Sequence, residues 1–276
     1  MRNTRAARRA GRVSLVIFDL AGTTVDYGSC APAAAFVELF RRHGITLRDD
    51  QARGPMGKDK KEHIRRLTDL AAVKKQWLRL HGRPCSAADV DALYHEFVPI
   101  QKVVLPRYSK LIPGTIESVR RLRAMDIRIA VTTGYPGEIL RLVLRAAKRQ
   151  GFEPDAAVCV NDVPAGRPAP WMALTCAMRL GVYPPAAAVK IGDTIVDIEE
   201  GLNAGMWSVG VTRTGNMLGL SYDDDKALPP ASRGRRLAKA RAAMTLAGAH
   251  YVVDGVADCA AVVRDINARL ARGDRP

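Results

Sequence analysis

Short apolar segments that alternate with helical patterns constrain this chain more than any other feature. These segments lack the polar–apolar alternation of a half-exposed strand, so we predict strands buried on both faces, as in parallel sheets. The segments are Val13–Leu20, Ile127–Thr133, Ala156–Val160, Ala187–Ile191 and Ser208–Thr212, with His250–Val253 as a possible edge strand. Helical patterns lie between most of them. The alternation predicts an α/β fold with a Rossmann-like, doubly wound parallel sheet.

One long region interrupts the alternation. Between the first strand and Pro113 the sequence is almost wholly helical, with patterns over Ala33–His43, Lys58–Leu70 and Ala87–Val104. An insertion at this point can cover the crevice at the carboxyl ends of the strands, where α/β sheets bind ligands. We therefore predict a catalytic core of residues 13–27 and 111–276, an inserted helical cap domain of residues 28–110, and a basic N-terminal extension of residues 1–12.

Composition narrows the class of protein. No run approaches the roughly 18 consecutive apolar residues that a membrane span needs, and the five cysteines are widely spread without a CxxC pair. We expect a cytoplasmic protein with no membrane partner, disulfide framework or zinc site. A net charge of +15, from 43 Lys and Arg against 28 Asp and Glu, is compatible with an anionic substrate or nucleic acid. Outside the Arg-rich N-terminus and Arg233–Arg241 the basic residues are dispersed, so we expect no nucleic-acid partner.

Polar side chains gather where the predicted strands end. They are Asp19 after the first strand, Thr133 and Gly134 after the second, Arg167 in a proline-rich loop, and Asp193 and Asp197 around the start of a helix. Each has an ordinary structural explanation, such as a turn residue, a helix cap or a solvated arginine. Together they offer a carboxylate nucleophile, hydroxyl and N–H donors, a planar cation that suits phosphate, and oxygen ligands that suit Mg²⁺.

The order of these residues resembles the motif set of the haloacid dehalogenase superfamily, and the resemblance extends over nearly the whole chain. It implies a haloacid dehalogenase-like core with an inserted helical cap, and a phosphoryl-transfer reaction that depends on Mg²⁺. The resemblance also implies specific roles: Asp19 as nucleophile, Thr133, Gly134 and Arg167 as the phosphate-binding residues, Asp19, the Ala21 carbonyl and Asp193 as metal ligands, and Asp197 as a supporting residue.

One position departs from the phosphatases of this superfamily. Those enzymes have a second aspartate two residues after the nucleophile, which protonates the leaving oxygen, whereas this chain has Ala21. Ordinary phosphomonoester hydrolysis should therefore be poor. The amino-acid sequences of several segments are instead similar to those of the phosphonatases, which hydrolyse phosphonoacetaldehyde to acetaldehyde and phosphate. These segments are Phe18–Gly28, Pro55–Gly57 with Lys60 and His63, Thr132–Tyr135, Asp162–Pro168 and Asn203–Trp207.

A lysine in the cap would explain how such an enzyme breaks a C–P bond. Breaking a C–P bond expels a carbanion, which leaves readily only if an imine formed by a lysine accepts its electrons. The family pattern places that lysine three residues after Met-Gly, which selects Lys60 over Lys58 and Lys61. His63 would share the helix face of Lys60 and move protons. We expect the neighbouring lysines to lower the pKa of Lys60, although such a cluster can also be a solvated basic face.

Several readings stay open at this stage. Met56 and Tyr135 are predicted near the substrate, and the family implies a homodimer. Cys30 receives no role, because Ser29 stands where the family often has cysteine. The alternatives are another enzyme of the superfamily, such as a phosphatase or dehalogenase, and a catalytically silent nucleic-acid or protein-binding module. We assign no function to residues 217–247.

Overall fold

A parallel sheet forms the centre of the protein. The computed structural model describes residues 11–276, so the predicted N-terminal extension lies almost entirely outside the described residues. Within them, a six-stranded sheet has the order β3-β2-β1-β4-β5-β6, and every neighbouring pair is parallel. The strands are β1 (Leu15–Phe18), β2 (Arg128–Thr133), β3 (Ala156–Cys159), β4 (Ala188–Gly192), β5 (Trp207–Val211) and β6 (Tyr251–Val253). The predicted α/β class is confirmed, and the expected edge strand is β6.

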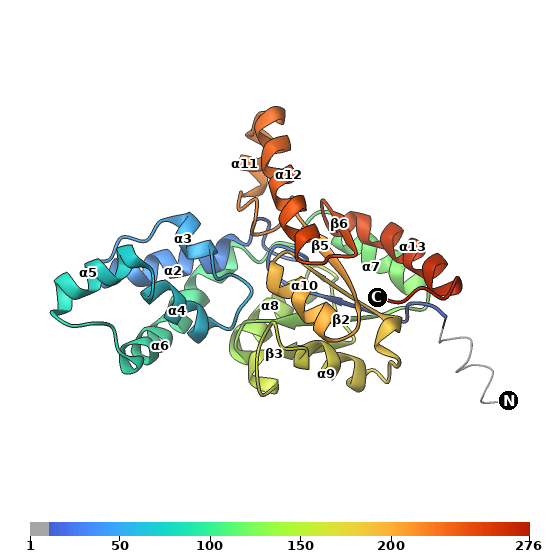
Figure 1. Ribbon diagram of the computed structural model, residues 1–276, viewed down its shortest axis with the longest axis horizontal. Helices are drawn as coiled ribbons and strands as arrows, with labels where there is room; N and C mark the ends of the chain where they lie inside the picture. Colours follow the sequence, from blue (N-terminus) through green and yellow to red (C-terminus); the bar gives the residue numbers. More distant parts are fainter. Residues whose placement is uncertain (1–10) are drawn as a thin grey trace.

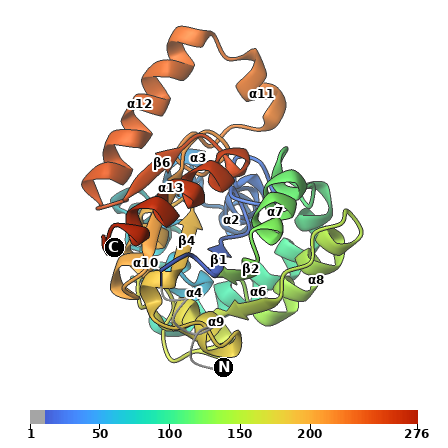
Figure 2. The same cartoon turned by 90° about the vertical axis from the view of Figure 1, so that its right-hand side faces the viewer.

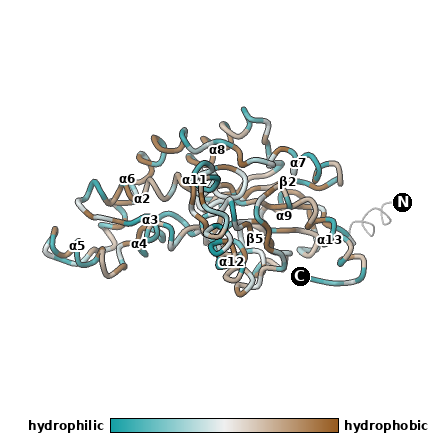
Figure 3. The backbone as a smooth tube through the Cα atoms, turned by 90° about the horizontal axis from the view of Figure 1, so that it is seen from above, coloured by the Kyte–Doolittle hydropathy of each residue, from teal (hydrophilic) through white to brown (hydrophobic). Residues whose placement is uncertain are grey.

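Helices cover both faces of this sheet (Figure 1). Successive residues of β1 point to opposite faces: Val16 and Phe18 join an apolar cluster with α7, α8 and α13, whereas Leu15 and Ile17 join one with α9. This is why the strands read as continuous apolar runs. The core helices are α7 (Thr115–Ala124), α8 (Gly137–Lys148), α9 (Trp171–Arg179), α10 (Ile195–Asn203) and α13 (Cys259–Ala271). In Figure 3, hydrophobic colours mark β5, and hydrophilic colours recur along the outer helices.

The inserted region forms a separate helical lobe beside the sheet (Figure 1). Its helices are α2 (Cys30–Arg42), α3 (Asp49–Arg53), α4 (Lys60–Thr68), α5 (Ala71–His81) and α6 (Ala87–Val104). They pack around an apolar cluster of their own, in which Phe36, Phe40, Trp77 and Phe97 are the large side chains. This cluster is separate from the two on the faces of the sheet, which supports the proposed division into a core of residues 13–27 and 111–276 and a cap of residues 28–110.

A helical hairpin made of α11 (Tyr222–Ala227) and α12 (Pro230–Leu246) stands away from the sheet (Figure 2). Its anchor is Asp225, whose buried carboxylate accepts hydrogen bonds from Arg213 at 2.7 Å, Arg233 at 3.0 Å and the Tyr27 hydroxyl at 2.7 Å. Tyr27 lies in the link between core and cap, so the hairpin is fixed beside that link.

Two further observations concern the class of protein. None of the helices within residues 11–276 is both long and apolar enough to cross a membrane. All five cysteines are free thiols.

Candidate active site

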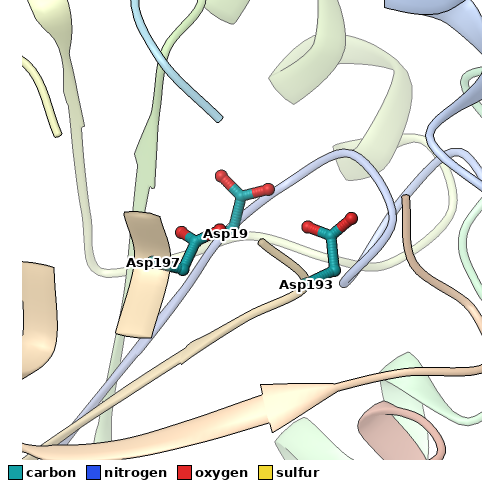
Figure 4. Close-up of side chains that lie close together, drawn as sticks. All are labelled: Asp19, Asp193 and Asp197. Atoms are coloured by element: carbon teal, nitrogen blue, oxygen red, sulfur yellow. The ribbon is translucent and has the colours of Figure 1, made fainter. Parts of the chain in front are cut away.

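Three aspartates converge at the carboxyl ends of β1 and β4. Asp19 follows β1, Asp193 follows β4, and Asp197 lies in the first turn of α10. Because β1 and β4 are neighbours in the sheet, one oxygen from each carboxylate lies within 4.8 Å of the others (Figure 4). All three side chains are buried. The strand ends thus place the predicted nucleophile and the predicted metal ligands together.

The loop after Asp19 is shaped by Gly22. This residue has φ +86°, and a Cβ there would collide with the Asp193 carboxylate and the backbone of Gly215. Only glycine tolerates both the conformation and the close approach. The Thr23 hydroxyl then donates to Asp193 at 3.3 Å, and the backbone N–H of Asn216 donates to its other oxygen at 2.7 Å. Asp193 is therefore held in place from two sides.

Arg167 connects Asp19, the predicted nucleophile, to a buried ion network. Its guanidinium pairs with Asp19 at 2.7 Å, Asp197 at 2.9 Å and Glu200 at 3.0 Å, and its side chain is only 1% exposed. Lys190 joins the same carboxylates, at 2.8 Å from Asp197 and 3.2 Å from Glu200. The guanidinium of Arg167, the predicted phosphate-binding residue, is therefore already paired with Asp19 and the neighbouring carboxylates.

Lys190 and Glu200 were missed by the sequence reasoning. Two signals could have found them. Lys190 stands between apolar residues in the middle of a buried strand, and Glu200 follows Asp197 by three residues on the same helix face. A fully buried charge requires a partner of opposite charge. A lysine in a buried strand therefore indicates that a nearby acidic residue is buried with it.

The three aspartates have different surroundings, which shift their pKa values in different directions. Burial raises the pKa of Asp19 although Arg167 opposes the shift, and burial together with Asp19 raises the pKa of Asp193 well above its ordinary value. Burial acts on Asp197 too, but Arg167 and Lys190 outweigh it and lower its pKa. Asp197 also accepts from the Thr194 hydroxyl at 2.5 Å. The oxygens left for a hard divalent cation are therefore those of Asp19 and Asp193, and this donor set fits such an ion.

Lys60 enters the site from the cap. It is the first residue of α4, whose N-terminus is capped by the Asp59 carboxylate. Its ammonium nitrogen lies 5.3 Å from the ring centre of Tyr135 in the core and 5.7 Å from that of Phe36 in the cap. The side chain is 5% exposed, so the solvated basic face considered above is wrong for this lysine.

A small pocket of about 20 Å³ brings core and cap together. Every predicted site residue except His63 and Asp197 lines it. The lining comprises Asp19, Ala21, Thr133, Gly134, Tyr135, Arg167, Asp193 and Thr194 from the core, and Ser29, Pro32, Met56, Gly57 and Lys60 from the insertion. Thr133 faces this pocket, whereas the Thr132 hydroxyl accepts from Arg167 and Lys190 in the ion network. The choice of Thr133 over Thr132 agrees with this arrangement.

Burial is the main influence on the Lys60 amine. It lowers the pKa of Lys60 to about 8, against the opposing effect of Asp19, and the Arg167 guanidinium adds to the lowering. The expectation that neighbouring lysines cause the shift needs correction. Lys61 points elsewhere and pairs with Asp91 at 2.5 Å. An apolar surrounding disfavours the ammonium more strongly than distant, solvated charges do.

His63 lies behind Lys60 rather than in the pocket lining. Its ring is fully buried and stacks on Phe36 with ring centres 3.9 Å apart. Nε2 is 2.8 Å from the carbonyl oxygen of Ala52, so Nε2 carries the proton, and Nδ1, which has no hydrogen-bond partner among residues 11–276, is left as an acceptor. Burial and the charge of Lys60 lower the pKa of His63 well below its ordinary value. A neutral imidazole is the consequence.

Comparison with known proteins agrees with the resemblance inferred from the motifs. The model of the haloacid dehalogenase-like hydrolase family matches residues 13–205. A phosphonoacetaldehyde hydrolase of Paraburkholderia phytofirmans is 48% identical over 264 residues, covering 96% of this chain and 99% of the relative. One from Nitratidesulfovibrio vulgaris is 46% identical over 266 residues, covering 96% and 95%.

The three-dimensional comparison gives the same result. The crystal structure of a phosphonoacetaldehyde hydrolase-like protein from Oleispira antarctica superposes with a TM-score of 0.95 at 43% identity, covering 97% of each chain. The predicted membership is confirmed. The chain belongs to the haloacid dehalogenase-like hydrolases and, among them, to the phosphonoacetaldehyde hydrolase family.

Proposed function

We propose that this enzyme hydrolyses phosphonoacetaldehyde to acetaldehyde and phosphate through an imine on Lys60 and a phosphorylated Asp19. One observation carries the proposal: a buried lysine whose pKa is lowered to about 8 lines the same pocket as Asp19. Ala21 lines that pocket too, where a phosphatase would have its acid. The site offers an electron sink for carbon, and the residue two positions after Asp19 offers no carboxylic acid for a leaving oxygen.

The first step uses the neutral amine of Lys60. The amine attacks the aldehyde carbonyl, water leaves, and a protonated imine forms. Neutral His63, with Nδ1 free, is proposed to accept and return the protons of this step. Its position behind Lys60 keeps the base away from phosphorus.

The second step breaks the C–P bond. Asp19 attacks phosphorus in line, and the electron pair of the C–P bond moves into the protonated imine to give an enamine. The contact of Arg167 with Asp19 at 2.7 Å orients the nucleophile. Thr133 and Gly134 at the end of β2 supply donors for the phosphoryl oxygens. Protonation of the enamine and hydrolysis of the imine release acetaldehyde, and water cleaves the phosphorylated Asp19.

A divalent cation completes the phosphoryl site. We propose Mg²⁺, held by Asp19 and Asp193 with the Ala21 carbonyl, where it would neutralise charge on the phosphoryl group. Asp197 supports the site through Arg167 and Lys190. The cytoplasmic location and the homodimer implied by the family stay predictions.

Borohydride trapping tests the proposal. The protein is incubated with phosphonoacetaldehyde and Mg²⁺, reduced, digested and mapped by mass spectrometry, while a parallel sample is assayed for phosphate and acetaldehyde. We expect an adduct on Lys60 and both products. Lys60→Arg should abolish adduct and products, and Lys61→Ala, a matched loss of a cap lysine, should retain them. A folded protein that forms neither adduct nor phosphate, or that hydrolyses simple phosphomonoesters more efficiently, contradicts the proposal.

A further inference from the structure

A second and much larger cavity lies beside the catalytic pocket. Its volume is about 730 Å³, against about 20 Å³ for the pocket, and the two share Met56 and Thr194 in their walls. The smaller volume has room for about one water molecule. The aldehyde and its phosphonate group cannot fit there with the cap in this position, so the large cavity is the adjoining space through which they can pass.

The cavity has a basic wall contributed by both domains. Lys58 of the cap and Arg236 and Lys239 of α12 line it, and none of these three forms an ion pair with any residue of the described range 11–276. The acidic residues in the wall are already paired: Asp49 with Arg53 at 2.6 Å, and Asp50 with Arg48 at 2.9 Å. The uncompensated charge in this space is therefore positive.

The fold holds this basic wall in place. Arg233 is bound to the buried Asp225 that anchors the hairpin. Arg236 and Lys239 follow Arg233 at intervals of three residues, so they project from neighbouring positions of α12. Residues 217–247, to which we assigned no function above, thus present to the space beside the active site two cations that have no ion pair within residues 11–276.

The partition between cavity and pocket is tight. Gly57 has φ +91°, and a Cβ there would collide with the side chains of Thr194 and Val196. The cap turn therefore rests directly on the start of α10. Met56 and Thr194, which line both spaces, therefore separate a molecule in the large cavity from Asp19.

We infer that this cavity is an anion vestibule, which concentrates the dianionic phosphonate at the closed cap and receives the phosphate product. The inference rests on the proposed function for the identity of the organic anion. Charged walls of one sign in a cleft raise the local concentration of an oppositely charged ligand and its association rate by 10-fold or more. The charge is also outside the catalytic pocket, so it acts on arrival and departure and leaves the chemical step alone.

The main test removes the charge of α12. Arg236→Gln/Lys239→Gln should lower kcat/KM for phosphonoacetaldehyde about 5-fold at roughly 0.01 M ionic strength, with kcat unchanged, because the Debye length there is about 30 Å. The difference should disappear at about 1 M salt. The matched control is Arg149→Gln/Arg264→Gln, which removes the same charge from two exposed residues that lie at the end of α8 and in α13, outside the cavity. Equal kcat/KM for the test variant and the wild type at low salt overturns the inference.

A second measurement separates this inference from the proposed function. Inorganic phosphate is titrated calorimetrically into the Mg²⁺-containing protein at low and high salt. The test variant should bind phosphate about 3-fold more weakly at low salt only, and the control variant should match the wild type. This result supports the vestibule whether or not the enzyme turns over phosphonoacetaldehyde. A lack of turnover would refute only the proposed function. No phosphate binding by the wild type, or equal binding by all three proteins, refutes the vestibule.

Discussion

The pH dependence of imine formation on Lys60 tests the central feature of the site. Burial moves the pKa of this amine from 10.5, the ordinary value, to about 8. At pH 7 that change raises the neutral fraction roughly 300-fold, to about one tenth of the molecules. Only the neutral amine attacks an aldehyde. The rate of imine formation should therefore rise tenfold per pH unit up to about pH 8 and then level off.

The assay uses the product aldehyde. Acetaldehyde and cyanoborohydride are added at a series of pH values, and the modified Lys60 peptide is quantified by mass spectrometry over time. Lys61→Ala is the control, because Lys61 pairs with Asp91 and burial dominates the shift. Its profile should keep the midpoint near 8. A rate that keeps rising through pH 10 refutes the burial argument, and a midpoint that rises in Lys61→Ala would restore the lysine-cluster explanation.

Three further predictions concern stability and closure. In Lys60→Met the free energy of unfolding should rise by up to about 3 kcal/mol at pH 7. The buried ammonium of Lys60 destabilises the folded wild type, because the pKa of Lys60 is lower in the folded state than in the unfolded state. This loss of stability is complete below about pH 8 and disappears as the pH approaches 10.5. The thermal unfolding temperatures of the two proteins should therefore converge between these pH values. Asp225→Ala leaves two arginines and a tyrosine without their acceptor, and should cost about 2 kcal/mol in denaturant unfolding and expose residues 217–247 to protease. Gly57→Ala should lower kcat about 10-fold in the phosphate-release assay without unfolding the protein, because its Cβ meets Thr194. Unchanged values in these assays would contradict the corresponding contacts.

The sheet and the strand-end residues could be predicted because both follow from local pattern. Continuous apolar runs specify buried parallel strands. Parallel strands end at one edge, so Asp19, Thr133 and Asp193 had to come close once their strands were recognised. The cap was predicted from its helical patterns alone, and its own apolar cluster agrees with that prediction.

Other features could not be predicted, because they depend on which distant residues become neighbours. A single sequence can suggest that Lys190 and Glu200 pair, but it does not show that Arg167 links Glu200 to Asp19. The pKa of Lys60 is set by burial between Phe36 and Tyr135, which lie far apart in the chain. The orientation of α12 depends on the contacts of Asp225 with Tyr27 and Arg213.

Cap closure and amine activation are linked in this structure. Tyr135, which helps to bury Lys60, and Arg167, whose charge lowers its pKa, both belong to the core, so part of the surroundings that lower the pKa of Lys60 exists only while the cap turn lies against α10. The lysine is therefore most reactive in the arrangement that also brings it to Asp19, the proposed nucleophile, and excludes water. Gly57→Ala, which hinders that arrangement, should shift the midpoint of the imine-formation profile upward from about 8 towards 10.5 as kcat falls. If kcat falls and the midpoint stays near 8, the two effects are independent, and the low pKa of Lys60 must come from the cap alone.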